Sequence, residues 1–465
     1  MKSFDYSTYL SPFTWRYGTE EMREIWSEIH KRKLWRRIWV ELAKTQHKER
    51  LINKKELDDI IKNQDAIDIE KSHETEKIIK HDLMAEIKTF AQSATIGGGK
   101  IHLGATSYDI EDNAETIRFK ESLKLIEKSL KDLLSEFGRK IKEYKDLPCM
   151  AYTHLQPAEP TTLGYRFAIY AQDILFDLNF LDFIKRNLKG KGIKGAVGTS
   201  ASYVRLTNNS AAEQMEKSIM KELGIDPVDI ATQVAPRKIE YFVSIFLSGV
   251  AQTLNKFAFD VRIMQSPGFG EWQEPFSEKQ VGSSAMPFKR NPWKSEQICS
   301  LARIVNNLSN ISKENSSNML LERTLDDSAN RRIYLPEMFL AIDEMLQSSV
   351  KITEGIVINK KQIEKNLNTY GPFAITEAVL METVKNGADR QQMHEILRDL
   401  SMKAWEEIQK DNVNPLAELI KNNTTISKFI EKDKLKTLLD PREHLGLAPQ
   451  RCTKFLSKLN DELSH

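Results

Sequence analysis

The sequence predicts an all-α protein built around a central bundle of long helices, and three observations carry this prediction. Glycine and proline are few, at 20 and 15 of 465 residues, so the chain has few obligatory breaks in regular structure. From Phe119 to Tyr144, apolar residues recur at alternating steps of three and four, the spacing of one face of a long helix. Residues 160–185 and 239–264 are apolar or small nearly all round, as in helices that are covered on every side.

Residues 1–111 are expected to form an N-terminal helical domain. Thr19 is expected to cap the first helix, because apolar residues follow it at helical spacing. Further helices are expected over residues 56–96. Three tryptophans at helical spacing are expected to pack in a core, namely Trp26, Trp35 and Trp39.

Residues 112–364 are expected to form the central bundle and, through it, the core of an oligomer. Besides the three long helices named above, two more are expected, over 294–312 and 334–357. The connection 189–203 contains glycines and hydroxyls, a weak signal for an anion-binding loop, and is interpreted as a flexible link. Residues 365–465 are more polar and are expected to form a C-terminal domain of shorter helices, with a break at Gly371-Pro372.

Composition excludes several classes of function. The chain has 68 Lys and Arg against 66 Asp and Glu, so its net charge of +2 gives no reason to expect nucleic acid as a partner. The three cysteines are far apart and fit neither a metal site nor a disulfide framework, which favours a reducing cytoplasm. No run of 18 apolar residues and no signal-peptide pattern is present, so neither a membrane span nor export is expected.

The richest concentration of chemical groups lies at residues 282–296, GSSAMPFKRNPWKSE. Glycine and proline mark this stretch as a loop of imposed shape, and a helical pattern begins near its end. It carries a hydroxyl on Ser283, a cation on Lys289, an amide on Asn291 and a carboxylate on Glu296. Such a set can bind a carboxylate substrate and move a proton beside it, although a polar surface turn has a similar composition.

Two other stretches contain groups suited to anions. Arg16 stands just before the start of a helix, where the helix dipole also favours negative charge, although a single arginine there is more often a solvated surface residue. The glycine-rich loop 98–109 offers main-chain amides with the hydroxyls of Thr106 and Ser107, but it lacks the lysine and spacing of a nucleotide-binding loop. A simple turn remains the alternative for this loop.

Three segments resemble the signature segments of the fumarase/aspartase superfamily, whose members release fumarate from succinyl compounds. They are GATSYDIEDNAE at 104–115, YTHLQPAEPTTLG at 152–164 and GSSAMPFKRNP at 282–292. The resemblance implies a three-domain, all-α fold with a central long-helix bundle. It also implies an anti-elimination, in which a base removes a proton beside a carboxylate and an acid protonates the leaving atom. Preorganised donors help most where charge develops on that carboxylate.

Four further stretches are similar to one branch of the superfamily, whose members act on succinylated purine nucleotides. They are RY at 16–17, KHDLMA at 80–85, TQVAPRK at 232–238 and ERTLDDSANRR at 322–332. The resemblance implies cleavage of adenylosuccinate to AMP, and of succinyl-aminoimidazole-carboxamide ribotide (SAICAR) to AICAR. Phosphate is the feature that sets these substrates apart, and charge-assisted contacts suit it. The expected phosphate ligands are Arg16, Tyr17, Arg323, Ser328 and Arg332.

The resemblance also implies the catalytic roles. His154 is similar to the family's general acid, and Glu296 to the carboxylate that orients this histidine. Ser283 is similar to the general base. Because a serine hydroxyl is a weak base at its free pKa, Lys289 and nearby amides would have to stabilise its alkoxide.

Further residues are expected to bind substrate by the same resemblance. The succinyl carboxylates would be held by Thr106, Ser107, Lys289 and Asn291, and Gln233 would also contact substrate. Lys80, His81 and Asp82 match a cluster at the purine and acid side, although a surface or capping role is the usual one for such a triplet. Some members have Arg where this chain has Gln297, so that contact is in doubt. The resemblance further implies a cytoplasmic homotetramer whose active sites are each shared by three subunits. No metal or cofactor is expected.

Two alternatives stay open at the level of sequence. One is argininosuccinate lyase or another branch of the superfamily, which would lack the Arg16-Tyr17 pair and the 322–332 segment. The other is a non-enzymatic bulk protein, since superfamily members have been recruited for that purpose. Intact catalytic candidates speak against the second alternative.

Overall fold

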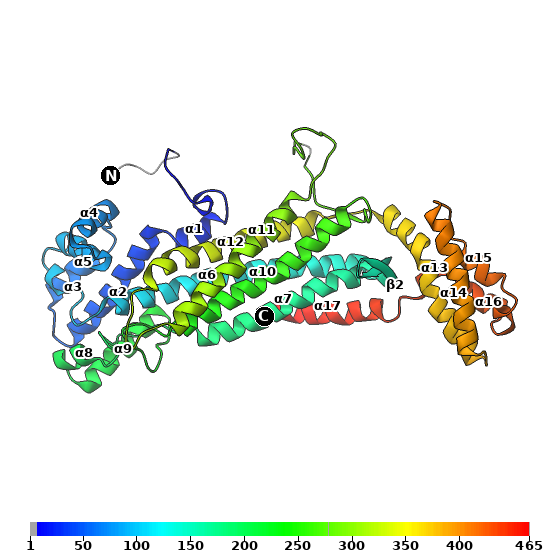
Figure 1. Ribbon diagram of the computed structural model, residues 1–465. Coiled ribbons are helices and arrows are strands. Elements are labelled where there is room, and N and C mark those ends of the chain that lie inside the picture. The colour runs from blue at the N-terminus through cyan, green and yellow to red at the C-terminus, as the bar shows by residue number, and fades with distance from the viewer. Residues whose placement is uncertain (1–6, 278, 465) are drawn as a thin grey trace. The chain divides into compact units, whose positions relative to one another are not determined.

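The structure is a computed structural model that describes residues 7–277 and 279–464, and helices dominate it (Figure 1). The all-α prediction is therefore confirmed. Two compact units can be distinguished. Unit 1 comprises residues 1–129, 176–254 and 300–347, and unit 2 comprises residues 130–175, 255–299 and 348–465. The predicted division into three domains stays a prediction.

Among the described residues, seven helices lie wholly within unit 1, and five long helices contribute residues to both units. The seven are α1 (Glu20–Ile25), α2 (Glu28–Lys48), α3 (Lys54–Lys62), α4 (Ile69–Ile79), α5 (Asp82–Ser93), α8 (Ala201–Leu206) and α9 (Asn209–Leu223). The five are α6 (Ser107–Tyr144), α7 (Leu163–Asn187), α10 (Lys238–Gln265), α11 (Trp293–Ser317) and α12 (Ser328–Gly355).

The described part of unit 2 contains the remaining helices and four short strands, and the sequence patterns did not predict these strands. Its helices are α13 (Lys360–Lys385), α14 (Arg390–Gln409), α15 (Leu416–Lys421), α16 (Lys432–Leu438) and α17 (Ala448–Ser464). Strands β1 (Pro148–Thr153) and β2 (Gln156–Thr162) form an antiparallel hairpin, and β3 (Trp272–Gln273) pairs with β4 (Val357–Ile358). Short 3-10 helices occur at Pro12–Thr14, Gly98–Lys100, Ile426–Lys428 and Pro441–Glu443.

The N-terminal core of unit 1 forms as the tryptophan spacing predicts. Trp35 and Trp39 are buried on α2 among aliphatic side chains of α3, α5, α6 and α9. Trp26 stacks on Phe339 with ring centroids 5.2 Å apart. The predicted N-cap is also confirmed, because the side chain of Thr19 accepts a hydrogen bond from the Met22 amide at 3.2 Å.

The long amphipathic helix is confirmed as α6, and it begins earlier than the apolar pattern suggested. Its first residue is Ser107, and it runs for 38 residues. The apolar positions that predicted it are buried, namely Phe119, Leu123, Ile126, Leu130, Leu133, Phe137, Ile141 and Tyr144. Burial of this stripe at roughly 2 kcal/mol for each large side chain makes α6 a principal source of stability.

Helices α7 and α10 are buried on one face only within the single chain. Phe176 is 62% exposed on α7 and Phe259 is 50% exposed on α10, whereas Phe167 and Phe246 are fully buried. Among the described residues, α10 is the one helix long and apolar enough to cross a membrane, and 56% of its most apolar stretch is buried inside the chain. A core helix of a folded domain has the same composition.

The interpretation of residues 189–203 as a flexible link is wrong. The ammonium of Lys191 lies 2.6 Å from the carboxylate of Asp109, and both side chains are fully buried. Backbone amides of Lys194 and Gly195 donate to the same carboxylate at 3.1 Å, and the hydroxyl of Tyr203 does so as well. The loop does bind an anion, but that anion is a carboxylate of the protein itself.

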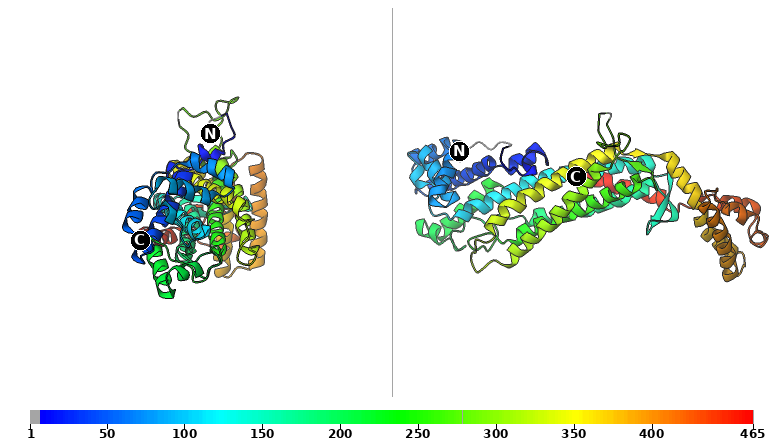
Figure 2. Two further views of the ribbon diagram at one scale, coloured as in Figure 1. Left: turned by 90° about the vertical axis from the view of Figure 1, so that its left-hand side faces the viewer. Right: turned by 45° about the horizontal axis from the view of Figure 1, so that its top comes forward.

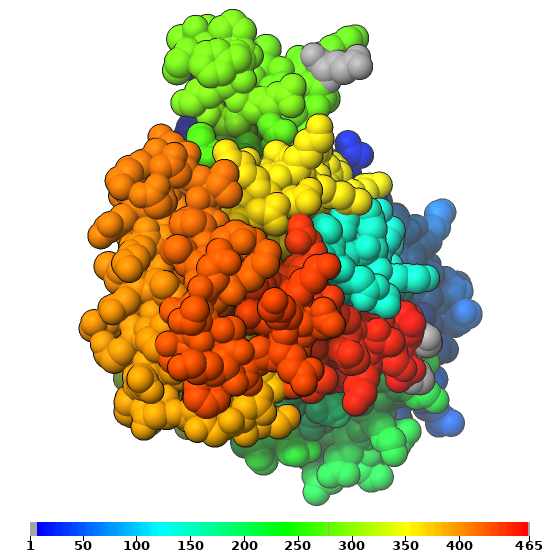
Figure 3. All heavy atoms as spheres, turned by 90° about the vertical axis from the view of Figure 1, so that its right-hand side faces the viewer, coloured from blue at the N-terminus to red at the C-terminus, as the bar shows by residue number. Residues whose placement is uncertain are grey.

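The predicted break at Gly371-Pro372 is also wrong, because α13 continues through both residues to Lys385. A proline inside a helix removes one backbone donor and costs about 3 kcal/mol. Packing offsets this cost, since α13 contacts β1, β2 and α14, and α13 and α14 lie side by side (Figures 1 and 2). Gly371 allows close approach, because an added Cβ would lie 2.7 Å from the Pro441 side chain. The C-terminal helices share their own apolar core, and Figure 3 shows the face that they form.

Candidate active site

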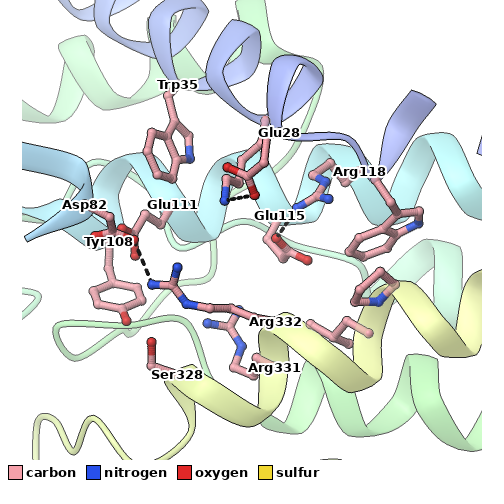
Figure 4. Close-up of a pocket in the computed structure, with 14 residues that line it drawn as sticks. Glu28, Trp35, Asp82, Tyr108, Glu111, Glu115, Arg118, Ser328, Arg331 and Arg332 are labelled. Atoms are coloured by element: carbon pink, nitrogen blue, oxygen red, sulfur yellow. Dashed lines mark hydrogen bonds and ion pairs between the residues drawn. The ribbon is translucent and has the colours of Figure 1, made fainter. Parts of the chain in front are cut away.

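A polar cavity of ≈ 160 Å³ lies in unit 1, between α2, α5, α6 and α12 (Figure 4). Three residues that sequence similarity assigned to substrate binding line it: Asp82, Ser328 and Arg332. The other lining residues are Trp26, Glu28, Lys31, Trp35, Tyr108, Glu111, Glu115, Arg118, Arg331, Leu335 and Pro336. The cavity is therefore rich in charges of both signs, with tryptophans among its walls.

Arg332 and Asp82 form an ion pair at this cavity. A guanidinium nitrogen of Arg332 donates to the Asp82 carboxylate at 2.7 Å. Burial opposes ionisation of Asp82, but the hydrogen bond and charge of Arg332 outweigh it and hold the pKa of Asp82 below its usual value. The Arg332 side chain is still 56% exposed, so a dissolved anion can reach its free nitrogens.

Glu111 is the carboxyl group of the cavity with the most perturbed ionisation. Burial raises its pKa to about 8, and the neighbouring carboxylates of Asp82 and Asp112 add to the effect. The positive charges of Arg332 and Arg331 act in the opposite direction without cancelling it. Glu111 is therefore mainly protonated at neutral pH, and it can donate a hydrogen bond into the cavity.

A buried network of charges supports the α12 side of the cavity. Arg237 donates to Asp112 at 3.0 Å and to Asp327 at 2.7 Å, and Arg331 contacts Glu240 at 2.7 Å. Arg323, an expected phosphate ligand, donates to Asp327 at 2.7 Å. Its guanidinium also donates to the Tyr108 hydroxyl and lies 4.4 Å from the centre of that ring.

Sequence reasoning missed several lining residues that a simple pattern marks. Tyr108, Glu111, Glu115 and Arg118 recur at steps of three and four on α6 and all line the cavity. That spacing predicts one helix face. A solvent-exposed face of a helix has the same polar spacing, so the spacing alone does not identify these residues as cavity lining.

The other expected binding residues of unit 1 do not line this cavity. Arg16 lies 5.8 Å from the ring centres of both Trp15 and Tyr17. The Thr106 amide donates to Asp109 at 3.0 Å, next to Ser107 at the start of α6. The Gln233 amide donates to the Glu322 carbonyl at 3.2 Å.

Lys80 and His81 occupy the junction of α4 and α5. Lys80 ends α4 in the left-handed region, with φ of 57°. His81 caps α5, because its ring nitrogen accepts from the Met84 amide at 3.4 Å. The capping role that is usual for such a triplet is therefore observed for His81. The cap also fixes the position of Asp82, the first residue of α5.

Unit 2 presents His154 at the tip of the β1–β2 hairpin. Thr153 pairs with Gln156, so His154 and Leu155 are the two residues of the turn, with φ of 54° and 60°. Glycine and asparagine are preferred in such a turn, and a left-handed conformation costs other residues about 1–2 kcal/mol each. Strain of this kind is characteristic of functional positions. The His154 side chain is exposed.

The loop 282–292 has a defined hydrogen-bond pattern around Ser283. The backbone amides of Ala285 and Met286 donate to the Ser283 hydroxyl oxygen at 3.3 and 3.1 Å. The Asn291 side chain donates to the Gly282 carbonyl at 3.0 Å and so closes the loop on itself. Amide donors therefore point at the oxygen that would carry charge if Ser283 lost its proton.

The stems of this loop are joined at the start of α11. Glu274 accepts from the backbone amides of Lys294 and Ser295, at 3.3 and 2.6 Å. Gln265 accepts from the Glu274 amide and donates to the Arg290 carbonyl, both at 2.8 Å. Gln265, the last residue of α10, thus binds the chain on both sides of the loop, at Glu274 and at Arg290.

Lys289 and Glu296 are exposed. Within the described part of this single chain, no hydrogen bond joins Glu296 to His154. Gln297 accepts from Lys294 at 3.1 Å, which gives it a local role at the start of α11. The same described residues contain no group of three or more His, Cys, Asp or Glu side chains that could hold a metal ion.

Comparison with known proteins agrees with this architecture. A fumarate lyase from Mesorhizobium sp. BNC1 superposes with a TM-score of 0.84 at 23% identity, covering 97% of this chain and 99% of that one. A 3-carboxy-cis,cis-muconate lactonizing enzyme from Pseudomonas putida gives a TM-score of 0.87 at 22% identity, with the same coverage. A family model described as "Lyase" matches residues 15–306. Fold and sequence together define a lyase of the fumarase/aspartase superfamily.

Nearer relatives specify the branch. The chain is 36% identical to the adenylosuccinate lyase of Saccharomyces cerevisiae, over 98% of this chain and 95% of that protein. The enzyme of Schistosoma mansoni is 37% identical over 99% and 97%, and that of Archaeoglobus fulgidus 35% over 97% and 99%. A model described as "Adenylosuccinate lyase C-terminus" matches residues 372–455. The chain belongs to the adenylosuccinate lyase family, which sets the argininosuccinate lyase alternative aside.

Proposed function

We propose that this protein is an enzyme that eliminates fumarate from adenylosuccinate to give AMP, and from SAICAR to give AICAR, in purine nucleotide synthesis. The observation that carries the proposal is similarity to adenylosuccinate lyases over nearly the whole length of both chains. The substrate needs a phosphate site, a purine site and two carboxylate sites beside an acid and a base.

The arginine cavity supports the phosphate site. Arg332 is accessible and already donates to an oxyanion, the carboxylate of Asp82. Ser328 begins the 28-residue helix α12, so its hydroxyl lies where the helix dipole favours negative charge. Arg16, Tyr17 and Arg323 complete the proposed phosphate ligands.

Ser283 is the proposed base that removes the Cβ proton of the succinyl group. Hydrogen bonds from the amides of Ala285 and Met286 favour negative charge on its oxygen. In this proposal the ammonium of Lys289, which is exposed in the same loop, adds to that stabilisation. The electron pair of the C–H bond moves toward the adjacent carboxylate, and the C–N bond then breaks to release fumarate.

His154 is the proposed acid that protonates the leaving nitrogen, and Glu296 orients it. An imidazole suits this role near neutral pH. Since no hydrogen bond joins Glu296 to His154 among the residues that the structure describes in one chain, we propose that the pair forms between chains. A homotetramer whose active sites each combine three chains would provide it, and the exposed apolar faces of α7 and α10 support such an assembly.

The remaining proposed binding residues would contact the succinyl carboxylates and the purine of the substrate. Thr106, Ser107, Lys289 and Asn291 hold the succinyl carboxylates in this proposal. Gln233, Lys80, His81 and Asp82 lie at the purine and acid side. The enzyme would act in the cytoplasm, where purine nucleotides are made.

The test is the absorbance change on adding adenylosuccinate to the purified protein, with fumarate and AMP identified as products in equal amounts. Absence of turnover with both adenylosuccinate and SAICAR would overturn the proposed activity. A parallel assay with succinyladenosine, which lacks the phosphate, tests the proposed phosphate site. Equal turnover of that nucleoside would refute the assignment of the arginines to phosphate binding.

A further inference from the structure

The hairpin that carries His154 has a weak ladder of its own. Two prolines of β2, Pro157 and Pro160, face β1 without an amide proton to donate. The register shifts between Met150 and Tyr152, where the pairing is irregular. With two strained residues at its tip as well, this hairpin needs anchors from outside to hold the imidazole in one place.

A fully buried carboxylate, that of Glu271, provides such an anchor. It accepts from the Tyr152 hydroxyl at 3.3 Å, from Arg166 at 3.1 Å and from the Asn366 side chain at 3.0 Å. The three donors come from β1, α7 and α13, all within unit 2. A buried carboxylate without such donors would be strongly destabilising, so these bonds are needed to keep the Glu271 carboxylate buried.

The backbone of Glu271 is held as firmly as its side chain. Its amide donates to the Met264 carbonyl at 3.1 Å, and its carbonyl accepts from the Asn359 amide at 2.9 Å. Arg166 also donates to the Met150 carbonyl, at the point where the register shifts. Glu271 is thus held in place through its backbone and its side chain, and its carboxylate is hydrogen-bonded to β1, the strand before His154.

We propose that Glu271 is a positioning residue for His154, and that it acts through the phenol of Tyr152, two residues before the histidine. The inference rests on the proposed function, in which His154 protonates the leaving nitrogen. Burial and the charge of Glu271 raise the pKa of the Tyr152 phenol, so the phenol keeps its proton and stays a donor at neutral pH. The ring of Tyr152 is fixed by an edge contact to Phe269, with centroids 4.9 Å apart.

The substitution Tyr152→Phe removes one oxygen and keeps the ring packing. We expect kcat for adenylosuccinate to fall about tenfold or more with KM nearly unchanged, because a small displacement of a catalytic group costs rate rather than binding. The solvent deuterium isotope effect on kcat should rise, because proton donation becomes more rate-limiting. A loss of stability alone would not change that isotope effect.

Tyr170→Phe is the matched control. It removes a phenol that donates to a carboxylate, that of Asp260, at 2.6 Å in the same unit, but it lies on α7 rather than on the hairpin. We expect it to lower the melting temperature and to leave both kcat and the isotope effect unchanged. If Tyr152→Phe kept wild-type kcat, or if Tyr170→Phe reduced kcat as much, the positioning role would be refuted.

A double-mutant cycle with Glu271→Gln gives a second measure. In the proposed arrangement the two substitutions break one connection, so their effects on kcat should not add. Additive effects would refute the inference. A wild-type protein that forms no fumarate would instead refute the proposed function, and His154→Ala with full activity would refute the assignment of the acid.

Discussion

The arginine cavity of unit 1 differs from the His154 hairpin and the loop 282–292, both of which belong to unit 2, in how the polar groups are held. In the cavity, charged side chains are paired within the chain, as in Arg332 with Asp82 and Lys31 with Glu28. In unit 2, His154, Lys289 and Glu296 are exposed, whereas the carboxylate of Glu271, which anchors the hairpin, is buried. A single chain therefore preorganises the cavity of the proposed phosphate ligands, whereas the proposed catalytic residues of unit 2 are exposed and need contacts from outside the chain to be held in place.

The largest expected effect tests that dependence directly. His154→Ala and Ser283→Ala should each lower kcat by several orders of magnitude, with substrate binding nearly intact for Ser283→Ala. Mixing the two inactive proteins under conditions that exchange subunits should restore part of the activity, because some sites would receive both intact residues. Ser284→Ala is the control and should keep near-wild-type turnover. A stable, fully active monomer would contradict the shared site.

A second prediction concerns buried against exposed charge pairs. Lys191→Met should lower the free energy of unfolding by about 3–5 kcal/mol, because it leaves the Asp109 carboxylate buried without its cation. Lys256→Met removes a pair of similar length, 2.7 Å to Asp173, whose lysine is 47% exposed, and should cost less than about 1 kcal/mol. Denaturant unfolding measures both, and equal losses would show that burial does not decide the difference.

Removal of Arg332 should separate binding from chemistry. Arg332→Ala should raise KM for adenylosuccinate more than tenfold with a smaller effect on kcat, since loss of a charge-assisted bond costs about 1.5–3 kcal/mol. The KM for succinyladenosine should stay the same, because that substrate has no phosphate. A parallel rise for both substrates would assign Arg332 to another part of the ligand.

The smallest expected effect is a dependence on pH that Glu111 confers. Its pKa is raised to about 8, so its contribution to stability is fully present below its unfolded pKa near 4.5 and is lost as pH rises through about 8. Ionisation also adds a negative charge beside Arg332, so KM for the nucleotide should rise severalfold between pH 7 and pH 9. Glu111→Gln should flatten this rise, and an unchanged profile in that variant would exclude Glu111 as its origin.

Much of the fold could be predicted from sequence because it depends on local periodicity. The stripe from Phe119 to Tyr144 and the spacing of Trp35 and Trp39 describe buried faces, and those faces are buried. The predictions of the fold are wrong where contacts with residues far away in the sequence determine the local structure. The partner of loop 189–203 is Asp109, about 80 residues earlier, and Pro372 is tolerated inside α13 because other elements pack on that helix.

The candidate site was predictable in its residue types but not in its contacts. Asp82, Ser328 and Arg332 came from similarity and do share one cavity, yet Glu111 and Tyr108 beside them required the structure. A side chain that lines a cavity has the same helical spacing as one that faces solvent, so polar periodicity alone does not distinguish them. The assignments of His154 and Ser283 stay predictions that the variants above address.

The ion pair of Arg332 with Asp82 has a consequence for how the enzyme responds to ionic strength. In the proposed phosphate site, an incoming phosphate would replace the Asp82 carboxylate as the counter-ion of Arg332. Dissolved salt competes for a free arginine more effectively than for one that has an internal counter-ion, because a paired charge projects a weaker field into solution. KM should therefore rise less steeply with salt concentration than it would if the arginines had no internal counter-ion. Asp82→Asn removes that counter-ion and should make the dependence of KM on salt steeper.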